Sequence, residues 1–482
     1  MLADRENELL LELIIMKANR SLLAMLLFTV ACTPDKSTTN GDISVWVTTG
    51  DRTTLFAEAP NKLTFKNQAD SSRVIEIDIT QHFQAIDGFG FALTGGSAYL
   101  LNQMLNPTQR ATLLKELFLT DGNAIGVSYL RISIGSSDLD NHVFSYDDMP
   151  TGKTDAGLTN FSLAEDQKNL IPVLKQILAL NPEVKIMGSP WSAPAWMKSN
   201  GSLKGGNLEP RYYDVYARYF VKYIQAMAVE GITIDAITLQ NEPENPKNNP
   251  SMLMTSGEQA VFVKENLGPA FEEAGIKTKI VVFDHNCDHP NYPMEVLNDG
   301  DAKKFIDGSA FHLYLGEIEA LSDVHDAHPD RNIYFTEQWT WSKGKFNGDL
   351  RWHLKNLIVG ATRNWSRNVL EWNLASDENY NPHTTDGGCT ECLGALTIGD
   401  SVTRNVSYYI IAHASKFVRP GSVRVGSNTM EGLPNVAFMT PSGKKVLIVL
   451  NEKDEVRDFW IKFKSKTTLA TLPGGAVATF VW

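Results

Sequence analysis

The chain has 482 residues, of which 43% are hydrophobic and 10% aromatic, and its formal net charge at pH 7 is -12. This composition supplies a large core and excludes a disordered chain, a collagen-like chain and a small disulfide-stapled domain. The acidic balance, without a cluster of Lys and Arg, argues against nucleic acid as a partner. Aromatic rings can stack on sugars as well as fill cores, so carbohydrate stays among the candidate ligands.

Residues 16–32 have the pattern of an export signal. Lys17 and Arg20 precede an apolar run over residues 22–30, and Cys32 follows shortly after it. The run is too short to span a bilayer, so it predicts a secretory signal and not a membrane helix. The residues before Cys32 resemble a bacterial lipobox, in which the cysteine is lipidated and becomes the mature N-terminus.

The export signal divides the N-terminal region into three parts. Residues 1–15 carry four acidic side chains, which the first part of a signal avoids, so we expect translation to begin at Met16. We expect residues 1–31 to be absent from the mature protein and residues 32–41 to form a flexible tether. The protein would then be exported and held at the bacterial cell envelope, with membrane contact only through the lipid on Cys32.

The rest of the chain changes its pattern twice. Residues 42–83 alternate with period two, as in SVWVTT and VIEIDI, which predicts strands. Over residues 84–418 short apolar runs alternate with amphipathic stretches, and over residues 419–482 the alternating pattern returns. The predicted barrel strands are IDGFGFAL, VSYLRISIG, VKIMGSP, ITIDAITLQNEP, KIVVFDH, GSAFHLYLG, RNIYFTEQW and NVLEWNLA; the predicted helices cover 163–180, 212–230, 257–274, 350–363 and 405–418.

Eight strands separated by helices are the number that closes a parallel barrel. We therefore predict an α/β fold, a (β/α)8 TIM barrel over residues 84–418. Residues 42–83 and 419–482 would together form an attached β-sandwich.

Two glutamates stand at the ends of predicted barrel strands. Glu242 follows the fourth strand in ITLQNEP, and Glu337 ends the seventh in YFTEQW. Barrel active sites form at the C-terminal ends of the strands, and a pair of facing carboxylates is what glycoside hydrolysis requires. Asn241 could hydrogen-bond the sugar hydroxyl next to the reacting carbon. The alternative from placement alone is two unrelated glutamates in surface salt bridges.

Several segments resemble glycoside hydrolase family 30, the family of the glucosylceramidases and β-1,6-glucanases. They are GFGFALTGGSA, YLRISIGSSDL, GSPWSAPAWMKSNGSLKGG, LQNEPE, AFHLY, FTEQW, LEWNLA and FVRPGS. The resemblance implies a retaining β-glycosidase on a TIM barrel with an attached β-sandwich. It further implies a carbohydrate substrate, either a β-1,6-glucan or a glucosylceramide-type β-glucoside, and no cofactor or metal.

The resemblance also assigns roles to individual residues. It makes Glu242 the acid/base and Glu337 the nucleophile. The implied substrate-binding residues are Arg131, Asp138, Trp191, Asn241, His312, Tyr314 and Trp372, whereas Trp196 is expected to belong to the wall. The sequence departs from the family at Leu313, where an aromatic residue is usual, and at Gly95-Gly96, so we expect the first loop to frame the site differently.

The two glutamates need different pKa values for this chemistry. We expect burial and the charge of Glu337 to raise the pKa of Glu242, and Arg131 to keep Glu337 ionised. In a retaining enzyme the two carboxyl groups lie about 5 to 5.5 Å apart.

Five polar residues crowd together after the fifth predicted strand, in FDHNCDHP. Asp284, His285, Cys287, Asp288 and His289 are all types that can bind a metal. No second cluster supports a metal site, so we expect hydrogen bonding at the barrel rim.

Cys389 and Cys392 form a CTEC element after the eighth strand. In a cytosolic chain they could be a redox or zinc pair, whereas in an exported chain a small-loop disulfide is favoured. We expect Cys287 to be unpaired and buried.

Two other functions stay open. A surface lipoprotein rich in aromatic residues could bind glycans without cleaving them, but such a protein has no need for two carboxylates at opposed strand ends. Among enzymes, a β-xylan-cleaving member is the alternative, and the first loop argues against it.

Overall fold

The computed structural model describes residues 42–67 and 72–482. The expectations for the export signal, the tether and Cys32 fall on residues 1–41 and lie outside the described residues. Within the described part of the chain, no helix is long and apolar enough to cross a membrane.

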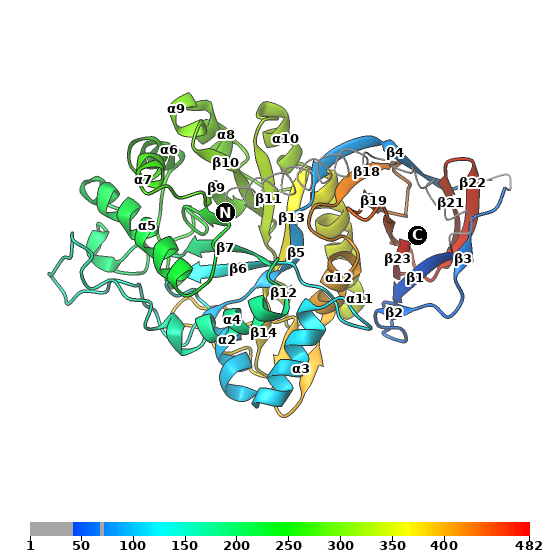
Figure 1. The fold of residues 1–482 in the computed structure, drawn as a ribbon, viewed down its shortest axis with the longest axis horizontal. Helices are drawn as coiled ribbons and strands as arrows, with labels where there is room; N and C mark the ends of the chain where they lie inside the picture. The colour runs from blue at the N-terminus through cyan, green and yellow to red at the C-terminus, as the bar shows by residue number, and fades with distance from the viewer. Residues whose placement is uncertain (1–41, 68–71) are drawn as a thin grey trace, which may run out of the picture. The chain divides into compact units, whose positions relative to one another are not determined.

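Eight parallel strands close into a barrel, as predicted, with the segment GFGFA as the first (Figure 1). Each strand pairs with its neighbours in chain order, and the last strand closes on the first. The strands are β5 (Gly88–Ala92), β6 (Tyr129–Ile134), β7 (Lys185–Pro190), β8 (Ala236–Thr238), β9 (Lys279–Asn286), β10 (Ile306–His312), β11 (Asn332–Glu337) and β13 (Ser366–Asn373).

The barrel interior is filled in layers, because side chains of a strand alternate between its two faces. One apolar layer takes a single residue from each of seven strands: Tyr129, Met187, Ala236, Val281, Ala310, Tyr334 and Leu370. Two residues further along six of these strands stand Arg131, Ser189, Thr238, His312, Thr336 and Trp372, all buried. The apolar layer therefore forms the floor beneath a polar layer at the C-terminal end of the barrel.

Helices cover the outside of the barrel (Figure 1). The predicted helix over 163–180 begins later, at Leu170, because a 3-10 turn and loop precede it. A helix that the sequence analysis did not predict, α3, starts at a capping box in which Asn106 and Gln109 bond each other's backbone. The helices are α2 (Gly95–Tyr99), α3 (Pro107–Phe118), α4 (Leu170–Leu180), α5 (Tyr213–Val229), α6 (Ser256–Phe262), α7 (Gly268–Glu273), α8 (Asn291–Asn298), α9 (Gly300–Lys303), α10 (Ala320–Ala327), α11 (Phe346–His353) and α12 (Val406–Ser415).

Short 3-10 and π-helical segments extend or precede several of these helices: η1 (Leu100–Met104), η2 (Asp166–Lys168), η3 (Ala195–Met197), η4 (Pro210–Tyr212), η5 (Val263–Leu267) and η6 (Leu354–Ala361). Five short strands lie in the loops at the barrel mouth and beyond: β12 (Thr340–Trp341), β14 (Ala375–Ser376), β15 (Cys392–Leu393), β16 (Leu396–Ile398) and β17 (Val402–Arg404).

The two ends of the described chain build the β-sandwich together, as predicted. Its strand order interleaves them, with β1 between β2 and β23 and β4 between β18 and β21. A separate apolar cluster that includes Ile43, Phe459 and Phe480 fills its interior. The strands are β1 (Asp42–Thr48), β2 (Ala57–Glu58), β3 (Leu63–Thr64), β4 (Val74–Ala85), β18 (Val423–Ser427), β19 (Asn435–Met439), β20 (Lys445–Leu450), β21 (Arg457–Phe463), β22 (Lys466–Leu472) and β23 (Val477–Val481).

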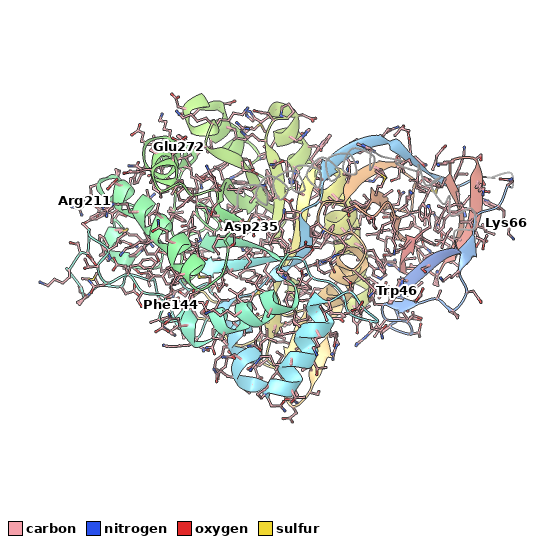
Figure 2. The ribbon with its side chains drawn as sticks, in the orientation of Figure 1. Trp46, Lys66, Phe144, Arg211, Asp235 and Glu272 are labelled. Atoms are coloured by element: carbon pink, nitrogen blue, oxygen red, sulfur yellow. A yellow bond between two sulfur atoms is a disulfide. The ribbon has the colours of Figure 1, made fainter. Side chains whose placement is uncertain are left out.

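The sandwich and the barrel share a core where α12 meets the sheet. Trp46 on β1, labelled in Figure 2, packs 5.6 Å from the ring of Phe417, just after α12. On α12, the buried His413 ring contacts the hydroxyls of Thr48 and Thr479 at 2.9 Å each. These contacts join strands from both chain ends to the last helix of the barrel.

Candidate active site

Both predicted glutamates lie at the mouth of the barrel, and both are buried. Glu242 follows β8, Glu337 is the last residue of β11, and each is 5% exposed. His312, the last residue of β10, contacts both of them through Nδ1, at 3.3 Å from Glu242 Oε1 and 3.8 Å from Glu337 Oε1. The surface salt bridges considered from the sequence are therefore excluded for this pair.

The distances to His312 limit the separation of the two glutamates. The sum of 3.3 Å and 3.8 Å, about 7.1 Å, is the greatest distance that the two Oε1 atoms can have. This limit is compatible with the spacing of about 5 to 5.5 Å that a retaining mechanism requires.

Two side chains hold Glu337 in place by hydrogen bonds. Arg131 Nη1 donates to its Oε2 at 2.6 Å, and the Tyr314 hydroxyl donates to its Oε1 at 2.8 Å. Burial raises the pKa of Glu337, against the lowering effect of the positive charges of His312 and Arg131.

Glu242 is held by the loop that follows it. The side-chain amides of Asn245 and Asn248 donate to its Oε2 at 2.7 and 3.1 Å. Its φ of 46° lies in the left-handed region, which a side chain such as glutamate rarely adopts and which marks a strained position. Burial raises the pKa of Glu242, but the hydrogen bond and charge of His312 outweigh burial and lower it to about 2.

The proton expected on Glu242 resides on its neighbour His312. Burial lowers the pKa of His312, but the charge of Glu337 and hydrogen bonds to Asp284 and Glu242 raise it to about 9. The expectation that Glu242 has a raised pKa is thus wrong, because we did not anticipate the positive charge of His312 beside it. The pair still holds one proton, which can lie on Nδ1 of His312 or on Oε1 of Glu242.

We expected Asp284 at the barrel rim, but it lies at the centre of the polar layer. Its carboxylate accepts from Arg131 Nη2 at 2.7 Å and contacts His312 Nε2 at 3.2 Å. Hydroxyls of Ser189, Thr238 and Thr336 donate to it at 3.2, 2.7 and 2.6 Å. Burial raises the pKa of Asp284, but Arg131 and His312 hold it far below its usual range.

An irregularity in β9 brings Asp284 inward. Regular alternation from Val281 would place Phe283 in the polar layer. Instead Phe283 and Asp284 have φ values of 72° and 68°, and the register with β10 shifts at this point. A bulge of this kind re-aims a side chain, and it is common beside active sites.

An aromatic wall borders the carboxylates. The rings of Trp191 and Trp372 lie 5.5 Å apart, and the Arg131 guanidinium lies over both, at 4.9 and 5.8 Å. The buried Nε1 of Trp191 has no partner among the described residues, so it is free to donate to a bound sugar. In contrast, Trp196 Nε1 donates to the carbonyl of Asp147 at 2.9 Å, as suits a wall residue.

Asp138 and Asn241 complete the predicted set. Asn241 Oδ1 accepts from Arg131 Nη2 at 2.7 Å. Burial, and then the charges of Glu337 and Glu242, raise the pKa of Asp138 to about 8. The structure therefore brings together every residue that the resemblance assigned to catalysis and substrate binding.

The two glycines of the first loop leave no room for a side chain. A Cβ on Gly95 would lie 1.7 Å from Asp140 Oδ1, and a Cβ on Gly96 would lie 2.5 Å from the carbonyl of Leu139. The loop that carries Asp138 thus packs directly on these glycines. Leu313, where an aromatic was expected, is buried in the core.

The structure pairs two of the three cysteines that it describes. Cys389 and Cys392 form a disulfide, and Cys287 is free and buried. The backbone of Cys389 hydrogen-bonds the carboxyl group of Asp138, so the disulfide loop supports the site.

The five polar residues of FDHNCDHP do not converge on a metal site. Asp284 and Cys287 are buried, whereas His289 is exposed and bonds Glu244 at 2.8 Å. A different trio, Glu242, His285 and His312, has ligand atoms within 4.8 Å of one another. Both oxygens of Glu242 and both ring nitrogens of His312 already have hydrogen-bond partners, so we treat this trio as part of the acid/base system.

The comparison with known families agrees with this geometry. Residues 86–418 match the glycosyl hydrolase family 30 TIM-barrel domain, and residues 421–480 match the glycosyl hydrolase family 30 beta sandwich domain. The chain belongs to glycosyl hydrolase family 30. It is therefore a glycoside-hydrolysing enzyme, as predicted.

Relatives within family 30 cover most of the chain. An endo-1,6-beta-D-glucanase of Neurospora crassa is 37% identical over 389 residues, 77% of this chain and 79% of the relative. The endo-1,6-beta-D-glucanase BGN16.3 of Trichoderma harzianum is 36% identical over 76% of this chain and 78% of its own length. The lysosomal acid glucosylceramidase of Mus musculus is 28% identical over 86% of this chain and 84% of its own. The solved structure of the endo-beta1,6-glucanase BT3312 superposes with a TM-score of 0.85 at 34% identity, covering 92% of this chain and 99% of that chain.

The sequence analysis missed several residues of this family 30 site. They are Ser189, Thr238, Asn245, Asn248 and Thr336, besides the central role of Asp284. Ser189, Thr238 and Thr336 stand two positions after inward-facing apolar residues, so strand alternation alone could have pointed to them. The bulge that turns Asp284 inward has no comparable signal in the sequence.

Proposed function

We propose that this chain is an endo-acting β-1,6-glucanase that works by a retaining, two-glutamate mechanism. The observation that carries the mechanism is the His312 ring lying against both Glu242 and Glu337 at the ends of the barrel strands. The substrate is supported by endo-1,6-beta-D-glucanases that are 36% and 37% identical over about three quarters of this chain.

In the first step Glu337 is the nucleophile. Its ionised carboxylate forms a bond to the anomeric carbon as the bond from that carbon to the leaving oxygen breaks. Glu242 gives its proton to the leaving oxygen. The hydrogen bonds from Arg131 and Tyr314 hold the Glu337 carboxylate in the attacking orientation.

His312 supplies the proton that Glu242 needs for this step. Before the sugar binds, His312 is the cation and Glu242 the carboxylate. A sugar that fills the site excludes water, which disfavours an ion pair relative to its neutral form. The proton then moves from Nδ1 to Oε1 across the 3.3 Å contact, with no change in net charge.

In the second step water replaces the departed chain. Glu242, now ionised, takes a proton from the water, whose oxygen attacks the anomeric carbon and displaces Glu337. Two displacements at one carbon retain the β configuration. Trp191 Nε1 and Asp138 would bind sugar hydroxyls, and Trp372 would support the ring.

An exposed tryptophan at the barrel mouth favours a long glucan. Trp341 is 44% exposed, and its Nε1 donates to Glu391 at 2.8 Å, which fixes the ring. Its strand β12 pairs with β15 at Cys392, which packs in the cluster of Trp191 and Trp372. Trp341 is thus a rigid flat surface a few residues beyond the nucleophile, suited to stacking on a further sugar of the chain.

Product analysis on pustulan, laminarin and a nitrophenyl β-glucoside tests this assignment. We expect oligosaccharides of several lengths early in the digestion of pustulan, a β-1,6-glucan, and little cleavage of laminarin, a mainly β-1,3-linked glucan. Retention would appear as β-anomers in the first NMR spectra. Faster hydrolysis of glucosylceramide than of pustulan, or release of glucose alone, would contradict the proposal.

We also propose that the enzyme is exported and lipid-anchored through Cys32. The support is the signal pattern of residues 16–32 and the lipobox-like residues before the cysteine. In a bacterial host fed labelled palmitate, the wild type should carry label and sediment with membranes, whereas Cys32→Ser should carry none. Equal labelling of both proteins would contradict the anchor.

A further inference from the structure

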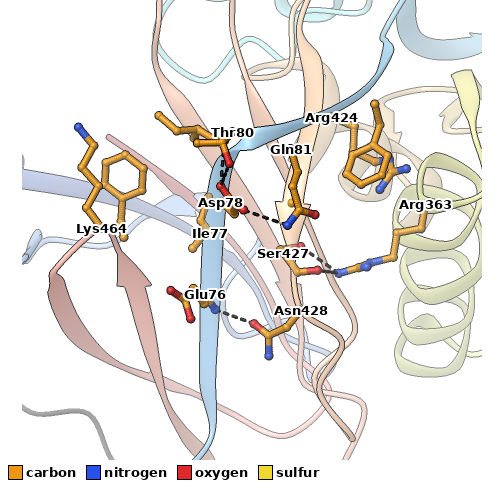
Figure 3. A pocket seen from close by; sticks show the side chains of 14 residues that line it. Glu76, Ile77, Asp78, Thr80, Gln81, Arg363, Arg424, Ser427, Asn428 and Lys464 are labelled. Atoms are coloured by element: carbon orange, nitrogen blue, oxygen red, sulfur yellow. Dashed lines mark hydrogen bonds between the residues drawn. The ribbon is translucent and has the colours of Figure 1, made fainter.

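Two arginines lie together in a cavity between the sandwich and the barrel, away from the catalytic site. Arg424 belongs to β18 of the sandwich, and Arg363 follows η6 of the barrel, just before β13 begins at Ser366. The catalytic residues stand at the C-terminal ends of the strands, so this cavity lies at the opposite, N-terminal end of β13. Figure 3 shows Arg363 reaching across from the helix to Ser427, close to Arg424.

Neither guanidinium has an anionic partner within residues 42–67 and 72–482. Arg363 donates only to neutral oxygens, those of Ser427 and Asn435. Arg424 donates through Nε to Gln84 Oε1 at 3.0 Å, and its four remaining N–H groups have no partner among the described residues. Within those residues no carboxylate oxygen lies within 4.0 Å of either guanidinium nitrogen set.

Arg131, the other buried arginine among the described residues, and the half-buried Arg367 are paired with acids, whereas the half-buried Arg419 donates only to backbone carbonyls. Arg131 contacts Asp284 and Glu337, and Arg367 contacts Asp87. Arg424 is only 6% exposed, yet the neighbouring charge that affects it is the second cation. Burial and the charge of Arg363 lower the pKa of Arg424 to about 9, which records an uncompensated positive charge.

Aromatic rings compensate for only part of this charge. The Arg424 guanidinium lies 3.5 Å from the ring centroid of Phe83 and 5.5 Å from that of Trp365. Such contacts offset only part of the free-energy cost of removing an ion from water. An anion in the cavity would supply the missing counter-charge.

The cavity has room for a ligand that brings this charge. Its volume is about 630 Å³, within the range of about 300 to 1,000 Å³ for small-molecule sites. The two acids on its wall contact residues other than the two arginines. Glu76 pairs with Lys462 at 3.4 Å, and Asp78 accepts from the backbone and side chain of Thr80 and from Gln81 (Figure 3).

We propose that Arg363 and Arg424 form a binding site for an oxyanion, the phosphate or sulfate group of a ligand held between the sandwich and the barrel. The four free N–H groups of Arg424 can donate two at a time to a tetrahedral oxyanion. Lys464, on the exposed wall, adds a third positive charge. The site is independent of the glycosidase reaction.

Calorimetric titration of the full enzyme with inorganic phosphate and with sulfate, at constant ionic strength in chloride, tests the proposal. We expect one saturable site in the wild type, at least tenfold weaker binding in Arg424→Gln and Arg363→Gln, and a few-fold weakening in Lys464→Gln. Hydrolysis of a nitrophenyl β-glucoside should be unchanged in all three variants. Arg211→Gln, which removes an exposed charge elsewhere, is the matched control and should bind like the wild type.

Lys464→Gln changes only an exposed side chain, so it keeps the test valid if an arginine variant fails to fold. A vesicle arm separates two sources of the anion. Sedimentation with phosphatidylglycerol vesicles but not phosphatidylcholine vesicles, lost in the variants, would assign the site to a lipid headgroup, and phosphate binding without sedimentation would assign it to a soluble ligand. Absence of saturable binding to the wild type, or equal binding in wild type and Lys464→Gln, would overturn the proposal.

Discussion

The ring of His312 lies between Asp284 and Glu242, with Nε2 3.2 Å from Asp284 Oδ1 and Nδ1 3.3 Å from Glu242 Oε1. The buried carboxylate of Asp284 therefore stabilises the positive charge of His312, and this charge contacts Glu242 on the other side of the ring. This chain of three groups explains why the proton shared by His312 and Glu242 resides on the histidine. It also makes the reaction sensitive to residues that never touch the sugar.

Replacing the two glutamates should separate their roles. We expect Glu242→Ala to lower kcat on pustulan by about 10² to 10⁴-fold, the usual contribution of a general acid or base. Azide should restore its activity on a nitrophenyl β-glucoside and give a β-glucosyl azide, because azide needs no base to attack the intermediate. Glu337→Ala should give the α-azide instead. Glu244→Gln, two residues from Glu242, is the control, and a loss as large as that of Glu242→Ala would contradict the assignment.

Asp284→Asn should move the alkaline limb of the pH profile. The His312–Glu242 pair loses its shared proton as pH rises through about 9 in the free enzyme. Without the negative charge of Asp284 the pKa of His312 falls, so the alkaline limb of kcat/KM should move to lower pH. Asp288→Asn, on the same loop, should leave the limb in place.

Asp284→Asn can fail to fold, since breaking a buried ion pair costs about 3 to 5 kcal/mol. Thr336→Val is a milder substitution that tests the same role of Asp284. Thr336→Val removes one hydrogen bond to the Asp284 carboxylate, so the negative charge of this carboxylate acts more strongly on His312 and raises its pKa. The alkaline limb should therefore move to higher pH, opposite to the shift in Asp284→Asn. An unchanged limb in both variants would exclude the proposed role of Asp284.

Trp341→Ala should weaken the action on long glucans only. An aromatic contact contributes about 0.5 to 1.5 kcal/mol, which predicts a KM for pustulan about two- to tenfold higher. Activity on a nitrophenyl β-glucoside should be unchanged, since that substrate does not reach Trp341. Trp352, on α11, is similarly exposed at 40%, so Trp352→Ala is the matched control. Equal losses on both substrates would contradict a distal sugar contact.

The folded protein should lose stability between about pH 4 and pH 8. Burial raises the pKa of Asp140 to about 7 and that of Asp166 to about 8, from 3.8. The folded state therefore binds these protons more tightly than the unfolded state, so the free energy of unfolding falls as pH rises through this range. Thermal melts should show a lower Tm at pH 8.5 than at pH 5, and Asp166→Asn should flatten the dependence. The exposed Asp214→Asn should keep it, and a Tm that rises with pH would contradict the prediction.

Much of the fold could be predicted because its signals are local. A short apolar run in the sequence predicts the strand GFGFA and each of the seven strands that follow it. Eight such strands separated by helices close into a barrel. The helix boundaries were less accurate, and α3 was missed although Asn106 and Gln109 form a capping box. Glu242 and Glu337 could be placed because the end of a strand is visible in the sequence.

The sequence by itself determined the barrel, the sandwich and the position of the two carboxylates at the strand ends, since periodicity and strand ends depend on neighbours along the chain. Only the tertiary structure decided which charges meet. Three features depend on contacts between distant parts of the chain. They are the bulge that turns Asp284 under the site, the proton on His312, and the cations Arg363 and Arg424, which have no anionic partner among the described residues. Whether a charge is compensated depends on distances in space and on the exclusion of water. The local pattern of residues predicts neither of these.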